Sequence, residues 1–304
     1  MKPELLTDEQ LQRSSPVGSP ILAHELFGTI PRRPKFVIFS SYGNDSVALI
    51  QWAHEQGLKD VVVVFSDTGW AAKWWADRVV QLAYWVHTLG FWTDRTTSIG
   101  FKELARQKRG FPTQKFQWCS YILKIEPGER WLAENDPDCR AVCLVGVRRE
   151  EGIDRSDFPR FNLNSNSHGG RVMVAPMADW TAETRDTFIE RAGVKALPHR
   201  SMECFPCVNS NKGDLQLLAE DPDRIDEVED LEIEMGFGKE LSKNGKPRGT
   251  FFRPTRHMGA TGIREVVRWA QSPRGKFVPA SGIVMQPDEL DEQEAGCEAG
   301  WCGI

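Results

Sequence analysis

The sequence lacks the features that mark membrane proteins, secreted proteins and proteins that coat nucleic acid. No uninterrupted apolar run approaches the roughly 20 residues that a membrane-spanning helix needs. The first residues, MKPELLTDEQLQRSS, are polar and acidic, whereas a secretory signal has a basic start and then an apolar stretch. The formal net charge of −5 argues against binding nucleic acid through bulk electrostatics. We therefore expect a cytoplasmic protein that makes no use of a membrane.

The sequence also lacks paired histidines and internal repeats. None of the six histidines falls in an H-x-x-H or H-E-x-x-H pattern, so we predict no histidine metal site. Seven cysteines are present, and in a reducing compartment such thiols serve as metal ligands, catalytic groups or core residues more often than as disulfides. The 304 residues are enough for one large domain with extensions or for two modest domains.

Short apolar runs alternate with helical patterns in the first two thirds of the chain. The runs are KFVIFSS, DVVVVFSDTG, AVCLVGVR at 141–148 and RVMVAPM at 171–177, and a further strand is expected near 91–97. Helical spacing follows the first two runs, in DSVALIQWAHEQG and AAKWWADRVVQLAYWVHTLG. Continuous apolar strands alternating with helices are typical of a parallel sheet covered on both faces. We therefore predict a doubly wound, mostly parallel α/β fold.

The composition divides the chain into four parts. Residues 1–33 are rich in proline, serine and charge and form a predicted extension. Residues 34–199 carry the alternating pattern and form the main domain. Residues 200–275 form a helical, cysteine-containing appendage with a long charged helical stretch from Lys212 to about Met235. Residues 276–304 form an acidic tail that ends with a cysteine pair.

The loop Ser-Tyr-Gly-Asn-Asp-Ser at 41–46 lies between the first predicted strand and the first predicted helix. Gly43 would let a ligand approach the backbone, the helix N-terminus favours an anion, and the serine hydroxyls add donors. In doubly wound sheets ligands bind beyond the carboxyl ends of strands, where this loop and the SDTG loop both fall. The pattern predicts a phosphate site. The alternative is that Asp45 or Ser46 only caps the helix.

Four ordered segments resemble the phosphoadenosine phosphosulfate reductase-like branch of the PP-loop superfamily, over most of residues 35–230. They are SSYGNDS as the phosphate loop, FSDTGW at 65–70, WCSYILKIEP at 118–127 with a Cys-then-Lys-x-x-Pro pattern, and GVRREEGIDR at 146–155. The resemblance implies that residues 34–199 are a PP-loop domain that binds an adenine nucleotide, either ATP with Mg²⁺ or a sulfonucleotide.

The resemblance also implies roles for single residues. The implied nucleotide-binding residues are Ser40, Ser41, Gly43, Asn44, Asp45, Ser46, Asp67, Thr68, Gly69, Arg148 and Arg155. Lys124, Asp45 and Cys302 are the implied catalytic residues. Arginine offers paired donors and lysine a point charge to phosphate or sulfate oxygens, although each alone is more often a surface ion-pair partner. Asp67 is a candidate for a nucleotide group or Mg²⁺, and the alternative is a strand-end cap.

The cysteines give a second set of candidates. Cys204 and Cys207 form a C-x-x-C turn, which favours a shared metal over a redox dithiol because the thioredoxin-like context is missing. The related cluster-bearing sulfonucleotide reductases and DNA-phosphorothioation ATP-pyrophosphatases imply Cys119, Cys204 and Cys207 as ligands of a 4Fe-4S cluster. The cluster-bearing reductases usually have adjacent cysteines at the first position, whereas Trp118 precedes Cys119 here, so Cys302 or Cys297 is the candidate for the fourth ligand. Zinc is the alternative metal, since it also accepts four thiolates.

The end of the chain, Cys302-Gly303-Ile304, resembles the Cys-Gly-Ile/Leu-His tail of sulfonucleotide reductases, without the final histidine. In that family the cysteine attacks the sulfonucleotide sulfur, so Cys302 is a candidate nucleophile as well as a candidate ligand.

The remaining candidates are structural. Cys143 is expected in the core and Cys139 in a loop. Trp70, Trp74, Trp75 and Trp85 are expected to pack in the core, and only an exposed tryptophan beside the cleft would suggest base stacking. Arg253, Arg256 and His257 form either an anion patch or a solvated loop.

Three functions follow from these patterns. The intact Asp-Ser of the loop favours an ATP-pyrophosphatase that adenylates a substrate for sulfur transfer, with nucleic acid as one acceptor that the resemblance allows. The tail favours the alternative, a sulfonucleotide reductase served by a thiol carrier. The third function is a nucleotide-binding sensor without turnover. A sulfur donor protein or thiol carrier is the implied partner, and the sequence does not indicate an oligomeric state.

Overall fold

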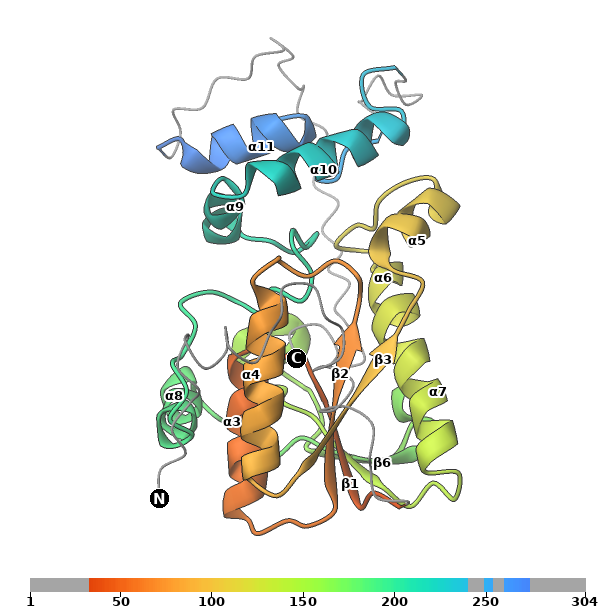
Figure 1. The fold of residues 1–304 in the computed structure, drawn as a ribbon, viewed down its shortest axis with the longest axis vertical. Helices are drawn as coiled ribbons and strands as arrows, with labels where there is room; N and C mark the ends of the chain where they lie inside the picture. The colour runs from red at the N-terminus through yellow and green to blue at the C-terminus, as the bar shows by residue number, and fades with distance from the viewer. Residues whose placement is uncertain (1–32, 240–248, 254–259, 274–304) are drawn as a thin grey trace, which may run out of the picture. The chain divides into compact units, whose positions relative to one another are not determined.

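The computed structural model describes residues 33–239, 249–253 and 260–273 (Figure 1). Within these ranges the chain forms two compact units. The sheet unit contains residues 33–98 and 120–203, and the helical unit contains residues 99–119 and the described residues between 204 and 273. The domain boundaries predicted at 33, 199 and 275 stay a prediction. No helix in the described part of the chain is long and apolar enough to cross a membrane.

The sheet unit is built on six strands in the order β3-β2-β1-β4-β6-β5. The strands are β1 (Phe36–Ser40), β2 (Val61–Asp67), β3 (Trp92–Thr97), β4 (Val142–Leu144), β5 (Phe161–Ser165) and β6 (Arg171–Val174). All neighbouring pairs are parallel except β5 with β6, which is antiparallel. The apolar runs form strands because almost every side chain of β1 and β2 is buried.

Helices cover both faces of this sheet (Figure 1). On one face lie α3 (Asn44–Glu55) and α4 (Trp75–Thr88), with α8 (Ala182–Arg191) packed on α3. On the other face lie the π-helix η1 (Tyr121–Ile125) and α7 (Glu126–Asn135), and the short α6 (Trp118–Ser120) precedes η1 in the chain. Short 3-10 turns are η2 (Arg149–Glu151), η3 (Ile153–Arg155) and η4 (Asn166–His168). The predicted doubly wound α/β fold is confirmed.

The core between the sheet and α7 shows how the apolar runs of the strands are buried. Val37, Phe39, Val62 and Val64 point to this face and pack against Trp131. Alternate residues of the same strands point to the α3 and α4 face, so both sides of each strand are apolar. Cys143 is fully buried in this core, as expected, and burial raises its pKa to about 12.

The helical unit contains α5 (Phe101–Lys108), α9 (Lys212–Leu218), α10 (Pro222–Glu234) and α11 (Gly262–Gln271). The stretch from Lys212 to about Met235 contains two helices, α9 and α10, separated by residues 219–221. Asp221 accepts a hydrogen bond from the Arg224 amide and caps α10, and Pro222 lacks the N–H that α9 would need to continue. Lys102 and Arg106 of α5 pair with Glu227 and Glu234 of α10.

Candidate functional site: a loop at the switch point of the sheet

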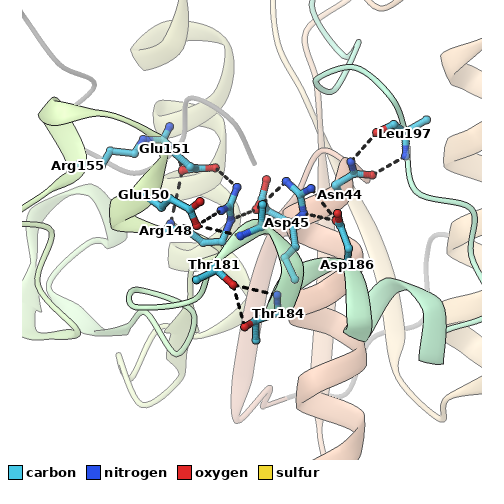
Figure 2. A network of polar contacts seen from close by, with 12 residues as sticks. Asn44, Asp45, Arg148, Glu150, Glu151, Arg155, Thr181, Thr184, Asp186 and Leu197 are labelled. Carbon is cyan, nitrogen blue, oxygen red and sulfur yellow. Dashed lines mark hydrogen bonds and ion pairs between the residues drawn. The ribbon is translucent and has the colours of Figure 1, made fainter.

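The strand order changes direction between β1 and β4. From β1 the chain builds outward through β2 and β3, and it later returns to add β4 on the other side of β1. Loops at such a switch point leave a crevice beyond the carboxyl ends of the two strands. The loop 41–46 follows β1 there, and Arg148 lies just after β4, with its side chain directed at Asp45 (Figure 2).

The loop has a fixed backbone shape. Tyr42 adopts a left-handed conformation with φ 59° and is fully buried. The amides of Tyr42 and Gly43 donate to the hydroxyls of Ser40 and Ser41, at 3.0 and 3.3 Å. These short-range bonds curl the chain between the strand and the helix.

Helix α4 holds the same loop from the side. The indole Nε1 of Trp75 donates to the Ser41 carbonyl at 3.1 Å, and Nε of Arg78 donates to the Tyr42 carbonyl at 2.8 Å. With the carbonyls turned toward α4, the loop does not present them to a bound anion. Sequence reasoning missed both partners: Trp75 was interpreted only as a core residue, and no motif marks Arg78.

The N-terminus of α3 is open. Its N-cap is Gly43, and within the described residues no side chain caps this end. Helix N-termini carry unpaired amides and a partial positive charge, which bind anions. The Ser46 hydroxyl is also fully buried and has no hydrogen-bond partner among the described residues. The alternative that Asp45 or Ser46 caps the helix is therefore wrong for this structure.

Asp45 instead faces the arginine that follows β4. Nε of Arg148 donates to Oδ1 of Asp45 at 2.6 Å, and only 6% and 11% of the two side chains are exposed. Arg185 of α8 approaches the same carboxylate oxygen at 4.0 Å. Burial alone would lower the pKa of Arg148, but Asp45 and the nearby glutamates raise it, so the guanidinium stays charged.

Two glutamates extend this network (Figure 2). Arg148 lies 3.5 Å from Glu150 and 3.6 Å from Glu151, and Glu151 pairs closely with Arg155. Burial and the charge of Asp45 raise the pKa of Glu151 above its ordinary value, against the opposing effect of the arginines. Both predicted phosphate contacts, Arg148 and Arg155, are thus held by carboxylates.

A segment that we call the strap, residues 197–203, lies against the loop. The Asn44 side chain exchanges two hydrogen bonds of 2.9 Å with the backbone of Leu197. A Cβ added to Gly43 would lie 2.7 Å from the Cβ of Ser201, so only glycine fits at this approach. The Ala72 amide donates to the Met202 carbonyl at 2.9 Å, which fixes the strap on its other side.

Lys124 meets the strap at Glu203. Nζ of Lys124 lies 2.5 Å from Oε1 of Glu203, with 11% and 6% of the side chains exposed. The Ser201 hydroxyl donates to the other carboxylate oxygen, and the Thr68 hydroxyl donates to the Glu203 carbonyl at 2.7 Å. Lys124 lies in the π-helix η1, a rare element often found at functional sites. Nothing in the local sequence marks Glu203 or Ser201.

The loop after β2 forms a tight turn. Oδ1 of Asp67 accepts a hydrogen bond from the Gly69 amide at 2.9 Å, and Gly69 has a left-handed φ of 62°. This geometry is the strand-end cap that the sequence left as the alternative for Asp67. Among the described residues no lysine or arginine pairs with Asp67, so its carboxylate keeps coordination capacity that Asp45 and Glu151 lack.

Three members of the predicted cysteine ligand set lie in the described part of the chain. Cys119, Cys204 and Cys207 are all half-buried and belong to the helical unit. In the described ranges no group of three or more His, Cys, Asp or Glu side chains is placed to hold a metal ion. Cys297 and Cys302 lie outside the described residues, so the metal site and the nucleophile stay predictions.

The tryptophans follow the expectation with one exception. Trp70, Trp75 and Trp85 are buried, whereas Trp74 is 44% exposed. The rings of Trp75 and His199 contact Trp74 edge-on, at 5.3 and 5.5 Å between centroids. An exposed indole thus lies one residue from the tryptophan that holds the loop. Cys139 is exposed, as expected. Arg253 is exposed, whereas Arg256 and His257 lie outside the described residues.

The comparisons with known proteins identify a family for residues 35–202. The family described as "Phosphoadenosine phosphosulfate reductase domain" matches residues 35–202, more than half of the chain. An uncharacterized protein of Methanocaldococcus jannaschii is 26% identical over 194 residues, which cover 62% of this chain and 38% of that protein. Adenosine 5'-phosphosulfate reductase of Streptomyces coelicolor is 28% identical over 94 residues, 29% of this chain and 37% of that protein. The chain thus spans less than two fifths of these relatives.

Two solved structures are similar at a lower level. Phosphoadenylyl-sulfate reductase from Candida auris, in a phosphate complex, is 14% identical with a TM-score of 0.39, covering 63% of this chain and 89% of that one. The U34-tRNA thiolase NcsA from Methanococcus maripaludis, solved with its 4Fe-4S cluster, is 12% identical with a TM-score of 0.41, covering 69% and 72%. Both scores are low, so neither structure indicates what this chain binds.

Proposed function

Because the chain belongs to the phosphoadenosine phosphosulfate reductase domain family, we propose that it is an enzyme that binds ATP at the loop 41–46 and releases pyrophosphate. The observation that carries the proposal is the open N-terminus of α3 together with the buried, unpartnered Ser46 hydroxyl. Both features supply donors for phosphate oxygens, and the whole S-x-G-x-D-S pattern is kept.

The reaction is transfer of the adenylyl group. A nucleophilic oxygen of the acceptor attacks the α-phosphorus, the bond to the bridging oxygen breaks, and pyrophosphate leaves with the electron pair. The amides of α3 and Ser46 bind the leaving phosphates. Lys124 and Arg148 balance the charge that develops on the phosphate oxygens. The adenylated acceptor is then the substrate for sulfur transfer.

Mg²⁺ fits this site through few protein ligands. The ion commonly binds one or two carboxylates together with substrate phosphates. Asp67 is the carboxylate of choice, because Asp45 and Glu151 are engaged by arginines. When bound, the ion neutralises phosphate charge.

The test is pyrophosphate release from ATP by the purified protein. We expect Ser46→Ala to lower kcat/KM by roughly tenfold to a hundredfold, because one phosphate donor is lost. Ser156→Ala removes an exposed hydroxyl from the same unit and serves as the matched control. A protein that binds no ATP and reduces a sulfonucleotide instead would contradict the proposal and favour the reductase alternative.

The cluster prediction is tested separately, since no step above uses a cluster. Anaerobically purified protein should contain iron and sulfide if Cys119, Cys204 and Cys207 gather around a cluster with a fourth thiolate, and Cys204→Ser should lose the iron. A colourless, iron-free protein would refute this ligand set.

A further inference from the structure

We propose that Glu203 is an internal competitor for the anion site of Lys124, so that the Glu203 carboxylate and a phosphoryl or sulfo oxyanion occupy Lys124 in turn. The inference rests on the proposed function, because it assumes that the anion is part of a ligand bound at the loop 41–46. Glu203 lies one residue beyond the segment that the family matches.

The contacts of Glu203 are those of a bound oxyanion. One carboxylate oxygen lies 2.5 Å from the Lys124 ammonium, and the other accepts from the Ser201 hydroxyl. Both charged side chains are nearly excluded from solvent. An ammonium and a hydroxyl that converge on one carboxylate would offer the same donors to a phosphoryl or sulfo group.

Because of their charges, the Glu203 carboxylate and the anion of a ligand cannot both contact Lys124 at the same time. Lys124 and Glu203 form a buried ion pair, and a further anion on Lys124 would face the negative charge of Glu203 where water does not screen it. The carboxylate therefore has to turn away, or the anion cannot enter. The competition lowers the affinity for any anion that lacks other strong contacts.

The Glu203 side chain can turn without moving the strap. The Thr68 hydroxyl binds the Glu203 carbonyl at 2.7 Å, and the Ala72 amide binds the Met202 carbonyl at 2.9 Å. Asn44 holds Leu197 at the start of the strap. None of these bonds involves the Glu203 carboxylate, so the exchange needs only side-chain rotation.

The experiment measures binding of inorganic tripolyphosphate by calorimetry, with neutral adenosine as the second probe. We expect Glu203→Gln to bind tripolyphosphate about tenfold tighter than the wild type, because the competing charge is gone. Its affinity for adenosine should stay unchanged, which a merely structural effect would not produce. Lys124→Met should bind tripolyphosphate weakly with or without the Glu203 change.

A matched control removes the same charge elsewhere in the sheet unit. Glu55 ends α3 on the side away from the loop and pairs with Arg191 at 2.8 Å. Glu55→Gln should leave tripolyphosphate binding as in the wild type. If Glu203→Gln lowers the melting temperature so far that binding cannot be measured, Glu203→Asp is the second variant. It keeps the charge but moves the carboxylate back by one methylene, so the affinity for tripolyphosphate should rise less than in Glu203→Gln.

The outcomes separate the two proposals. If the wild type binds tripolyphosphate and Glu203→Gln binds it equally or more weakly while folded, Glu203 is not a competitor and the proposed function stands. If neither protein binds tripolyphosphate or ATP, the nucleotide site itself is refuted.

Discussion

Gly43 is the residue where the loop meets the strap. Its φ of −74° is open to any residue, so the need for glycine is steric. A methyl group there would meet the Cβ of Ser201 at 2.7 Å, shorter than two carbon atoms tolerate. The site therefore depends on a missing side chain as much as on the charged ones.

We expect Gly43→Ala to push the strap from the loop and to weaken ATP binding by roughly tenfold, about 1.4 kcal/mol. The loss of unfolding free energy should stay at about 1–3 kcal/mol, typical of overpacking. Calorimetric titration and denaturant melts measure the two effects. Gly110→Ala is the control, since its Cβ would meet nothing within 4 Å, and equal affinity in both variants would refute the steric argument.

At this scale the sequence predicts the loop but not its partners. The residues of the loop are contiguous, so the pattern S-x-G-x-D-S identifies them together. Arg148 stands 103 residues from Asp45, and Glu203 stands 79 residues from Lys124. Such pairings depend on how β1, β4 and the strap pack against one another, and a local sequence pattern does not indicate that packing.

At the scale of elements, one buried ion pair joins α7 to β6. Nε of Arg171 donates to Asp136 at 2.6 Å, and both side chains are almost fully buried. Arg171 also donates to the Leu132 carbonyl at 2.9 Å, at the end of α7. Burial would raise the pKa of Asp136, but the bonds from Arg171 and two backbone amides lower it overall.

We expect Arg171→Met to reduce the free energy of unfolding by roughly 3–5 kcal/mol, because Asp136 is left buried without its cation. The double change with Asp136→Leu should recover part of this loss. A lowered pKa means that the pair stabilises the wild type above the ordinary aspartate value of 3.8 and loses this effect as the pH falls through the folded pKa. Urea melts between pH 3 and 7 provide the measurement, and a single variant as stable as the wild type would refute it.

A second junction joins α10 to α11. The Glu232 carboxylate is fully buried and accepts from the amides of Ile263 and Phe251, at 2.8 and 2.7 Å. Burial raises its pKa from 4.5 to about 7, although the two amides oppose the shift.

A raised carboxyl pKa stabilises the fold below the unfolded value and loses that effect as the pH rises to the folded value. We therefore expect α11 to lose about 3 kcal/mol of protection between pH 4.5 and 7 through Glu232. Hydrogen exchange of the α11 amides measures it. Glu232→Gln should show no such difference, and the same pH slope in both proteins would contradict the assignment.

Elements with continuous apolar runs were predictable, and elements at the surface were not. β1 and β2 are buried on both faces, so their sequences are almost entirely apolar and indicate buried strands. β5 escapes prediction because FNLNS alternates without burial, with Phe161 and Leu163 64% and 72% exposed. α8 buries only Ile189, so its sequence shows no apolar stripe.

At the scale of the whole molecule, ligand binding and stability are linked. A ligand that binds only the folded chain, at one hundred times its Kd, adds about 2.7 kcal/mol to the free energy of unfolding. We expect ATP with Mg²⁺ to raise the melting temperature by several degrees in scanning calorimetry, and the shift to shrink in Ser46→Ala. A similar rise with adenosine alone would mean that the phosphates make no contact.

The path of the chain between the two units has a consequence for synthesis. α5 leaves the ribosome after β3, yet its ion-pair partners on α10 are more than a hundred residues away. The first three strands can pair at once, whereas the partners of α5 on α10 are made only after residue 222. A pause in translation between residues 120 and 140 would leave a nascent chain with β1 to β3 but without β4 to β6, and with α5 before its partners on α10, a stage at which exposed apolar surface favours aggregation.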